Sequence, residues 1–210
     1  MLKSTQSTEH PLDSAGVWCQ IIRRLAAGRP ALFLDRDGAV IEDTGYLCRV
    51  EDIVVIPGAA DVIAAANRRS IPVIMVTNQS GIGRGYYGWA EFNAVQNAII
   101  TSLSTAGATI DAVYACAHHP QGQGDLAHPD HPARKPNPGM LLQAAASLEI
   151  DLKASWLVGD KADDIEAAKR AGIAGALLVA TGHGGAETER NRRRKLLVVF
   201  GFLRPARLRR

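Results

Sequence analysis

Two aspartates that could bind a cation or share a proton follow the first apolar run of this 210-residue sequence. Residues 31–34 lead directly into Asp35, Arg36, Asp37 and Gly38. On an extended segment, residues two apart point the same way, so the carboxylates of Asp35 and Asp37 are expected side by side. Like charges this close favour a bound cation or a shared proton. An isolated pair of aspartates is also typical of an ordinary polar loop. The residues at the other strand ends must therefore distinguish a functional site from such a loop.

Groups that suit a phosphoryl substrate stand after a second apolar run and before a predicted helix. Residues 73–76 end in Thr77 and the stretch 78–85, where hydroxyl, amide and backbone N–H groups can donate hydrogen bonds to an oxyanion. Arg134 and Lys135 come just before the predicted helix at 138–148. An arginine can bind phosphate through two nitrogens, and a lysine supplies a point charge.

A third acidic site follows a later apolar run. Residues 156–158 end in Gly159 and Asp160, with Asp164 one helical turn further on. Asp160 can complete a hard-cation site with Asp35, and carboxylate oxygens are the ligands that Mg²⁺ prefers. Such groups at successive strand ends make an ordinary polar loop a poor explanation.

The elements that must hold these groups alternate along the chain. Strands are predicted at 31–34, 73–77, 112–116, 156–158 and 176–179, and helices at 59–69, 89–106, 138–148 and 163–171. Apolar strands separated by helices predict an α/β fold with a central parallel sheet and helices on both faces. Ligands bind at the carboxyl ends of the strands in such a sheet. A further short helix is predicted within 16–28 from the spacing of its apolar residues.

The composition is that of a folded globular protein, with 47% hydrophobic and 21% charged residues. No run approaches the ~18 uncharged apolar residues of a membrane span, which argues against a membrane partner. Three scattered cysteines favour a reducing compartment, and no secretory signal is visible at the start. We therefore expect a soluble cytoplasmic protein, with a monomer as the default.

Basic residues are concentrated at the C-terminal end. Between Glu187 and Arg210, nine basic side chains stand against two acidic ones, within an overall net charge of +3. Such a tail is most often a solvated terminus, although it could also bind an acidic surface or nucleic acid. The sequence shows no basic groove interleaved with aromatic residues, which argues against nucleic acid.

The strand-end motifs resemble those of the haloacid dehalogenase (HAD) superfamily of phosphatases. The resemblance covers about 31–182 and is carried by the motif at 35–38, by Thr77, by Lys135 and by the acidic loop at 159–164. It implies a Rossmann-like HAD fold. The loops at 38–57 and 81–89 are too short for a large cap domain. The expected organisation is an N-terminal extension with a short helix (1–30), a HAD phosphatase domain (31–185) and a basic C-terminal tail (186–210).

The resemblance also implies roles for individual residues. Asp35 would be the nucleophile that forms an aspartyl-phosphate, and Asp37 the acid and base for the leaving group and the water. Lys135 and Thr77 would stabilise the transferring phosphoryl group. Mg²⁺ would be held by the Asp35 carboxylate, the backbone carbonyl of Asp37, and Asp160.

Longer strings at 77–85, 116–122 and 134–142 narrow the resemblance to the heptose bisphosphate phosphatases. It then implies a small-molecule sugar bisphosphate as substrate and removal of the 7-phosphate of D-glycero-D-manno-heptose 1,7-bisphosphate, in ADP- or GDP-heptose biosynthesis. The substrate contacts implied are Asp43, Thr44, Gly45, Tyr46, Asn78, Gln79, Ser80, Gly81, Ile82, Arg134 and Lys161. Arg134 is the expected contact for the phosphate that is not cleaved.

Other functions compete with this interpretation. A histidinol-phosphate phosphatase has similar motifs, and a polynucleotide 3′-phosphatase would give the basic tail a use. The loop at 118–122 fits the heptose enzymes better. A non-catalytic binding module with a HAD fold is a different class of function, and the intact Asp35, Asp37, Lys135 and Asp160 argue against it.

One loop departs from the pattern of the heptose phosphatases, which usually carry a structural zinc site of Cys-x-His followed by Cys-x-Cys. This chain keeps Cys116 and His118 but has His131 where one of the later cysteines belongs. A zinc site built on these three would need a fourth ligand, from His128 or Asp130. A metal-free loop is the preferred interpretation.

Overall fold

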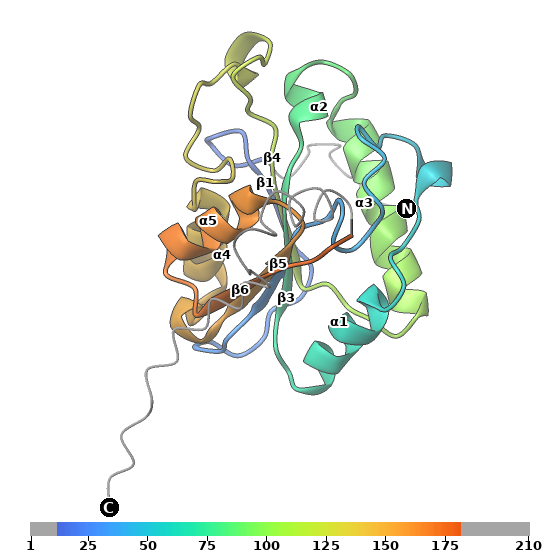
Figure 1. Cartoon of the computed structure of the whole chain (residues 1–210), viewed down its shortest axis with the longest axis vertical. Helices are drawn as coiled ribbons and strands as arrows, with labels where there is room; N and C mark the ends of the chain where they lie inside the picture. The colour runs from blue at the N-terminus through green and yellow to red at the C-terminus, as the bar shows by residue number, and fades with distance from the viewer. Residues whose placement is uncertain (1–11, 182–210) are drawn as a thin grey trace, which may run out of the picture.

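A computed structural model describes residues 12–181, in which a mixed six-stranded sheet lies between two layers of helices (Figure 1). The strands are β1 (Trp18–Ile21), β2 (Leu32–Leu34), β3 (Val73–Asn78), β4 (Ala112–Cys116), β5 (Trp156–Gly159) and β6 (Gly175–Leu178). Their order across the sheet is β1-β4-β3-β2-β5-β6. Neighbouring strands are parallel except β1, which runs antiparallel to β4.

The main helices cover both faces of the sheet, with α1 and α3 on one and α4 and α5 on the other (Figure 1). The helices are α1 (Ala59–Arg68), α2 (Ser80–Gly83), α3 (Trp89–Thr105), α4 (Gly139–Leu148) and α5 (Ala162–Ala171). The predicted α/β fold with a mostly parallel sheet is confirmed. None of the helices between residues 12 and 181 has the length and apolarity for a membrane crossing.

Most strand residues are apolar because both faces of the sheet are covered. Along β3, Val73 and Met75 pack into the core that contains α1 and α3, while Ile74 and Val76 pack into the core that contains α4 and α5. Successive side chains of a strand point to opposite faces, so a sheet buried on both sides has no polar alternation.

The helix predicted within 16–28 is wrong, because this segment supplies the edge strand β1. Its residues pair with β4, with Trp18 opposite Ala115 and Ile21 opposite Ala112. Neighbouring residues are buried on opposite faces: Val17 belongs to one core and Trp18 to the other. Two adjacent apolar positions imitate helical spacing, which explains the error. The segment is therefore part of the sheet, and the basic tail at 186–210 lies outside the described residues.

The strand order brings the chemical motifs together. β2 lies between β3 and β5, so the carboxyl ends of these three parallel strands are neighbours. The crossover helices run to opposite faces on the two sides of β2. A parallel sheet binds ligands at such a reversal of winding.

Candidate active site

Asp35 lies at the end of β2, and it is 4% exposed. Its backbone N–H donates to the carbonyl of Val158 on β5 at 2.9 Å. Lys135 Nζ lies 2.8 Å from Asp35 Oδ1 and 2.5 Å from Asp164 Oδ1, and it also donates to the Val76 carbonyl at 3.0 Å. Each partner fixes the lysine from a different element, so the ammonium has a defined position beside the predicted nucleophile.

Burial and charge act against each other in this cluster. Burial raises the pKa of Asp35 and the Lys135 ammonium lowers it. Burial has the larger effect, so the resulting pKa is about 6. Burial lowers the pKa of Lys135, but the carboxylates of Asp164 and Asp35 outweigh burial, so the pKa lies above its ordinary value. The lysine therefore stays charged at neutral pH and places a permanent positive charge at the site.

The same region offers a set of oxygen ligands for a cation. Asp35, Asp160 and Asp164 are buried, and one ligand atom from each lies within 4.8 Å of the others. A cluster of carboxylates with no nitrogen or sulfur ligand fits a hard cation such as Mg²⁺. Gly38 is needed beside it, because its φ is +88° and a Cβ there would lie 2.3 Å from Asp160 Oδ2. Asp164 was not among the predicted ligands, although its spacing from Asp160 was a usable signal.

Asn78, at the end of β3, joins that strand to the loop that carries Lys135. Its Nδ2 donates to the Lys135 carbonyl at 2.9 Å, and the Lys135 backbone N–H donates to its Oδ1 at 3.0 Å. The neighbouring Thr77 hydroxyl donates to Asp37 Oδ2 at 3.3 Å. Asn78, a predicted substrate contact, and Thr77, predicted to stabilise the phosphoryl group, therefore also hold other residues of the site in place.

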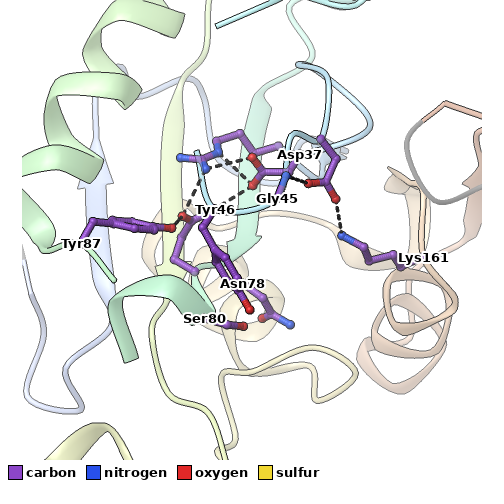
Figure 2. A pocket seen from close by; sticks show the side chains of 10 residues that line it. Asp37, Gly45, Tyr46, Asn78, Ser80, Tyr87 and Lys161 are labelled. Carbon is purple, nitrogen blue, oxygen red and sulfur yellow. Dashed lines mark hydrogen bonds and ion pairs between the residues drawn. The ribbon is translucent and has the colours of Figure 1, made fainter. Parts of the chain in front are cut away.

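A pocket of about 290 Å³ opens next to the buried cluster (Figure 2). A second cavity of about 40 Å³ contains Asp35 and Lys135. The two cavities share Asp37, Asn78 and Lys161 in their linings. The small cavity has the groups for phosphoryl transfer, and the larger one has room for the organic part of a small phosphate ester.

Seven predicted substrate contacts line the larger pocket: Asp43, Gly45, Tyr46, Asn78, Gln79, Ser80 and Lys161. Arg36, Asp37 and Tyr87 complete the lining. Tyr87 and Lys161 extend into it from opposite sides (Figure 2). Arg36 lies between the two aspartates after β2 but was assigned no role from the sequence, because the carboxylates alone indicated the chemistry there; Tyr87 follows no strand directly.

The remaining predicted contacts do not line the pocket, namely Thr44, Gly81, Ile82 and Arg134. Gly81 and Ile82 are buried in the short helix α2. Arg134 Nη1 donates to Ser80 Oγ at 2.9 Å and to the His118 carbonyl at 3.1 Å. Arg134 is thus connected to the pocket through Ser80.

Two long basic side chains join the loops around the pocket. Lys161 Nζ lies 3.0 Å from Asp43 Oδ2, which links the loop after β5 to the loop after β2. Arg84 donates to the Tyr46 hydroxyl at 2.8 Å and to Gln121 Oε1 at 2.8 Å. These contacts hold together loops that are far apart in the sequence. Residues 12–181 form no separate cap domain over the pocket, so these loops are what surrounds it.

The predicted zinc ligands lie close together but do not converge on one point. The rings of His118 and His131 stack with centroids 3.7 Å apart and 7° between planes, and Cys116 Sγ lies 3.8 Å from His131 Nδ1. His131 Nδ1 accepts from the Ala133 N–H at 3.1 Å, and His118 Nε2 donates to the Ala15 carbonyl at 2.9 Å. Within residues 12–181 the compact group of potential ligands is the aspartate cluster. Cys116, His118 and His131 as placed do not fit a tetrahedral zinc site.

Known sequences resemble this chain over most of its length. The HAD-hydrolase-like family matches residues 132–201. The D-glycero-beta-D-manno-heptose-1,7-bisphosphate 7-phosphatase of Mesorhizobium japonicum is 51% identical over 174 residues, which cover 82% of this chain and 80% of that protein. The protein of the same name from Escherichia coli is 39% identical over 158 residues, covering 75% and 83%. The chain belongs to the heptose bisphosphate phosphatases of the HAD superfamily.

Solved structures agree with this family. A HAD-like phosphatase from Mesorhizobium loti has a TM-score of 0.80 and 50% identity, covering 82% of this chain and 83% of its own. The heptose 1,7-bisphosphate phosphatase of B. bronchiseptica, solved with magnesium and phosphate, has a TM-score of 0.69 and 32% identity, covering 77% and 86%. The fold of the heptose bisphosphate phosphatases therefore extends over most of the described residues.

Proposed function

We propose that this protein is a Mg²⁺-dependent phosphatase that removes the 7-phosphate of D-glycero-β-D-manno-heptose 1,7-bisphosphate. The observation that carries the proposal is the buried Asp35–Lys135–Asp164 cluster beside a pocket of about 290 Å³. Membership of the heptose bisphosphate phosphatases supports the substrate, and the names of the relatives from Mesorhizobium japonicum and Escherichia coli support the β anomer.

The reaction proceeds in two transfers of the phosphoryl group. A carboxylate oxygen of Asp35 forms a bond to phosphorus as the bond to the sugar oxygen breaks, and Asp37 gives its proton to that oxygen. A water molecule then attacks the aspartyl-phosphate and gives a proton to Asp37. Inorganic phosphate leaves, and Asp35 is restored as a carboxylate.

The charges around the phosphoryl group explain why this geometry suits the reaction. Asp35, Asp160 and the Asp37 backbone carbonyl would hold Mg²⁺, which would supply positive charge to the phosphoryl oxygens. Lys135 adds a fixed positive charge from within the protein, and Thr77 orients Asp37. Positive groups that are already in place before the reaction stabilise the charge of the transition state, and this effect accounts for much of the catalysis of phosphoryl transfer.

The sugar and its second phosphate occupy the larger pocket. Lys161, whose side chain is 40% exposed, offers a positive charge in the lining, and Arg134 is connected to the lining through Ser80. We assign the phosphate that stays on the sugar to these two basic residues. Arginine and lysine together provide both a directed and a non-directed contact for phosphate oxygens.

The cellular setting and assembly belong to the same proposal. The three cysteines are free, which agrees with a reducing cytoplasm. We propose a monomer that acts on a small molecule, with residues 31–185 as the catalytic unit and β1 completing its sheet. Nucleic acid and membrane are not expected as partners.

The direct test compares substrates with the purified protein and Mg²⁺. Phosphate release is measured from the α and β anomers of the heptose bisphosphate and from histidinol phosphate. We expect kcat/KM to be at least ~100-fold higher for the β anomer, which corresponds to about 2.7 kcal/mol. Equal, slow release from all three would leave a HAD phosphatase with a different substrate.

The nucleophile is tested by Asp35→Asn, which keeps the size of the side chain but removes its negative charge. We expect kcat to fall by at least ~10³-fold because the covalent intermediate cannot form. Circular dichroism and thermal unfolding provide the control that the variant is folded. More than trace turnover by a folded variant would contradict the assignment.

A further inference from the structure

The carboxylate of Asp37 is held by donors that differ between its two oxygens. Oδ2 accepts from Arg36 Nε at 3.0 Å, from Gln79 Nε2 at 3.0 Å and from the Thr77 hydroxyl at 3.3 Å. Among residues 12–181, the donor to Oδ1 is Arg36 Nη2, at 2.9 Å. A carboxylate offers about two acceptor positions on each oxygen, so Oδ2 is fully used and Oδ1 is not.

Arg36 is rigid enough to impose this arrangement. It is 1% exposed, and its guanidinium contacts both oxygens of Asp37 in a two-point contact that fixes the plane of the carboxylate. The same group lies over the Phe92 ring, 5.4 Å from the centroid. Arg36 also donates to Gln79 Oε1 at 3.1 Å. A buried cation with partners on several sides has few alternative rotamers.

Gln79 transmits a further constraint from Tyr87. The Tyr87 hydroxyl donates to Gln79 Oε1 at 2.6 Å, while Gln79 Nε2 donates to Asp37 and to the Thr77 hydroxyl. The amide oxygen therefore faces two donors and the amide nitrogen faces two acceptors. A flipped amide would lose all of these bonds, so Tyr87 helps to set which end of Gln79 faces Asp37.

We infer that Arg36 and Gln79, braced by Tyr87, position Asp37 so that Oδ1 is the oxygen that exchanges a proton with the leaving group. The inference rests on the proposed phosphatase function, in which Asp37 is the acid. Arg36, Gln79 and Tyr87 are positioning residues: they act on the reaction through Asp37. Figure 2 shows Tyr87 and Asp37 on the border of the pocket that would receive the leaving group.

This inference predicts a dependence on the leaving group. An ester with a poor leaving group needs the proton from Asp37 as its bond to phosphorus breaks, whereas a good leaving group departs without it. Phenyl phosphate and p-nitrophenyl phosphate are nearly equal in size but differ in this need. Since kcat/KM includes steps only up to loss of the leaving group, it does not report the later attack of water on the aspartyl-phosphate.

The experiment measures kcat/KM for both aryl phosphates with Arg36→Lys, Gln79→Leu and Tyr87→Phe. The readout is the ratio of p-nitrophenyl to phenyl phosphate, which is independent of the fraction of folded enzyme in a sample. We expect the ratio to rise about tenfold for Arg36→Lys and Gln79→Leu, and about threefold for Tyr87→Phe. Asp37→Asn removes the acid and sets the upper limit of the ratio.

A matched control lies next to Tyr87 in the chain. Tyr86 is 59% exposed, and its ring packs against Tyr46, so Tyr86→Phe removes a hydroxyl from the same loop outside the Asp37 network. Its ratio should equal that of the unaltered protein. Positioning variants that slow both substrates equally would overturn the inference, because that is the effect of general structural damage. An unchanged ratio in Asp37→Asn would overturn the acid role as well.

The ratio separates this inference from the choice of sugar. Neither aryl phosphate requires recognition of a heptose, so a failure to hydrolyse the heptose bisphosphate leaves the two ratios unaffected. The positioning role and the sugar specificity are thus decided by different measurements.

Discussion

Lys135 shows how much one residue contributes at the centre of this site. Its ammonium contacts the buried carboxylates of Asp35, directly after β2, and of Asp164, in the first turn of α5, which lie more than a hundred residues apart in the chain. Without that cation, two negative charges would face each other with little water to screen them. Lys135 therefore has a structural function in addition to the stabilisation of the phosphoryl group.

Replacement of Lys135 by methionine tests this double function. We expect Lys135→Met to lose about 3–5 kcal/mol in the free energy of unfolding, because buried charge is left uncompensated. The measurement is urea unfolding in the presence of EDTA. Lys169→Met is the matched control, since Lys169 is 73% exposed and its ion pair with Glu166 spans 3.8 Å at the surface. Equal losses in the two variants would contradict the expectation.

His131 gives the stability a dependence on pH. Burial, together with a smaller electrostatic effect of the neighbouring His118 and His128, lowers the pKa of His131 to about 4. In the unfolded chain a histidine titrates near 6.5, so as the pH falls the unfolded state takes up the proton first. The contribution of the neutral His131 ring to the free energy of unfolding is therefore fully present above about pH 6.5, and it is lost as the pH falls toward 4.

The change His131→Gln removes this titration. We expect the melting temperature of the variant to decline less between pH 7.5 and pH 4.5 than that of the unaltered protein, as measured by differential scanning fluorimetry in EDTA. Carboxylates titrate in both proteins and cancel in the comparison. Parallel pH profiles would show that the stacked histidines do not contribute.

At the scale of secondary-structure elements, β1 is the part of the sheet that local pattern did not reveal. The strand is short, and it is held by its pairing with β4 and by Trp18, which is 1% exposed. The Trp18 ring stacks on Trp89 at 5.4 Å and meets Phe92 edge-on at 5.1 Å, both on α3. An edge strand with one large buried anchor fastens the N-terminal segment to the helical layer.

Loss of that anchor should weaken the whole sheet edge. We expect Trp18→Ala to reduce the free energy of unfolding by about 3–5 kcal/mol through the cavity that it leaves. Ile22→Ala, just after the strand, is the control, because Ile22 is 42% exposed and should cost less than about 1 kcal/mol. Chemical denaturation of both variants measures the difference. A small loss for Trp18→Ala would show that β1 is not anchored by this side chain.

At the scale of the whole molecule, folding itself creates the cation site. Asp35, Asp160 and Asp164 are brought within 4.8 Å of one another only because β2 and β5 are neighbours. An unfolded chain has no such cluster, so Mg²⁺ should bind the folded state and stabilise it. Metal binding and global stability are therefore linked.

This linkage predicts a rise in melting temperature on addition of Mg²⁺ to protein freed of metal by EDTA. At 10 to 100 times Kd the gain is about 1–3 kcal/mol. Asp160→Asn should lose the gain, whereas Asp125→Asn, at an exposed position of a short 3-10 helix, should keep it. A shift that is the same in both variants would point to a cation site elsewhere.

The sequence by itself determined the parallel sheet and the residues at the ends of its strands. Strands buried on both faces have a local signature, an uninterrupted apolar run, and β4 begins and ends at the predicted residues. Asp35 could be predicted as a site residue because it follows such a run directly. Both are properties of short segments, so the amino-acid sequence alone is enough to predict them.

Only the tertiary structure decided which distant groups meet. Asp164 contacts Lys135, and Tyr87 reaches Asp37 through Gln79, because strand order and loop packing place them together. The same holds for β1, whose apolar residues suit a helix until the edge of β4 offers them a partner. Local pattern records the propensity of a segment, whereas these contacts depend on which surfaces the rest of the chain presents to it.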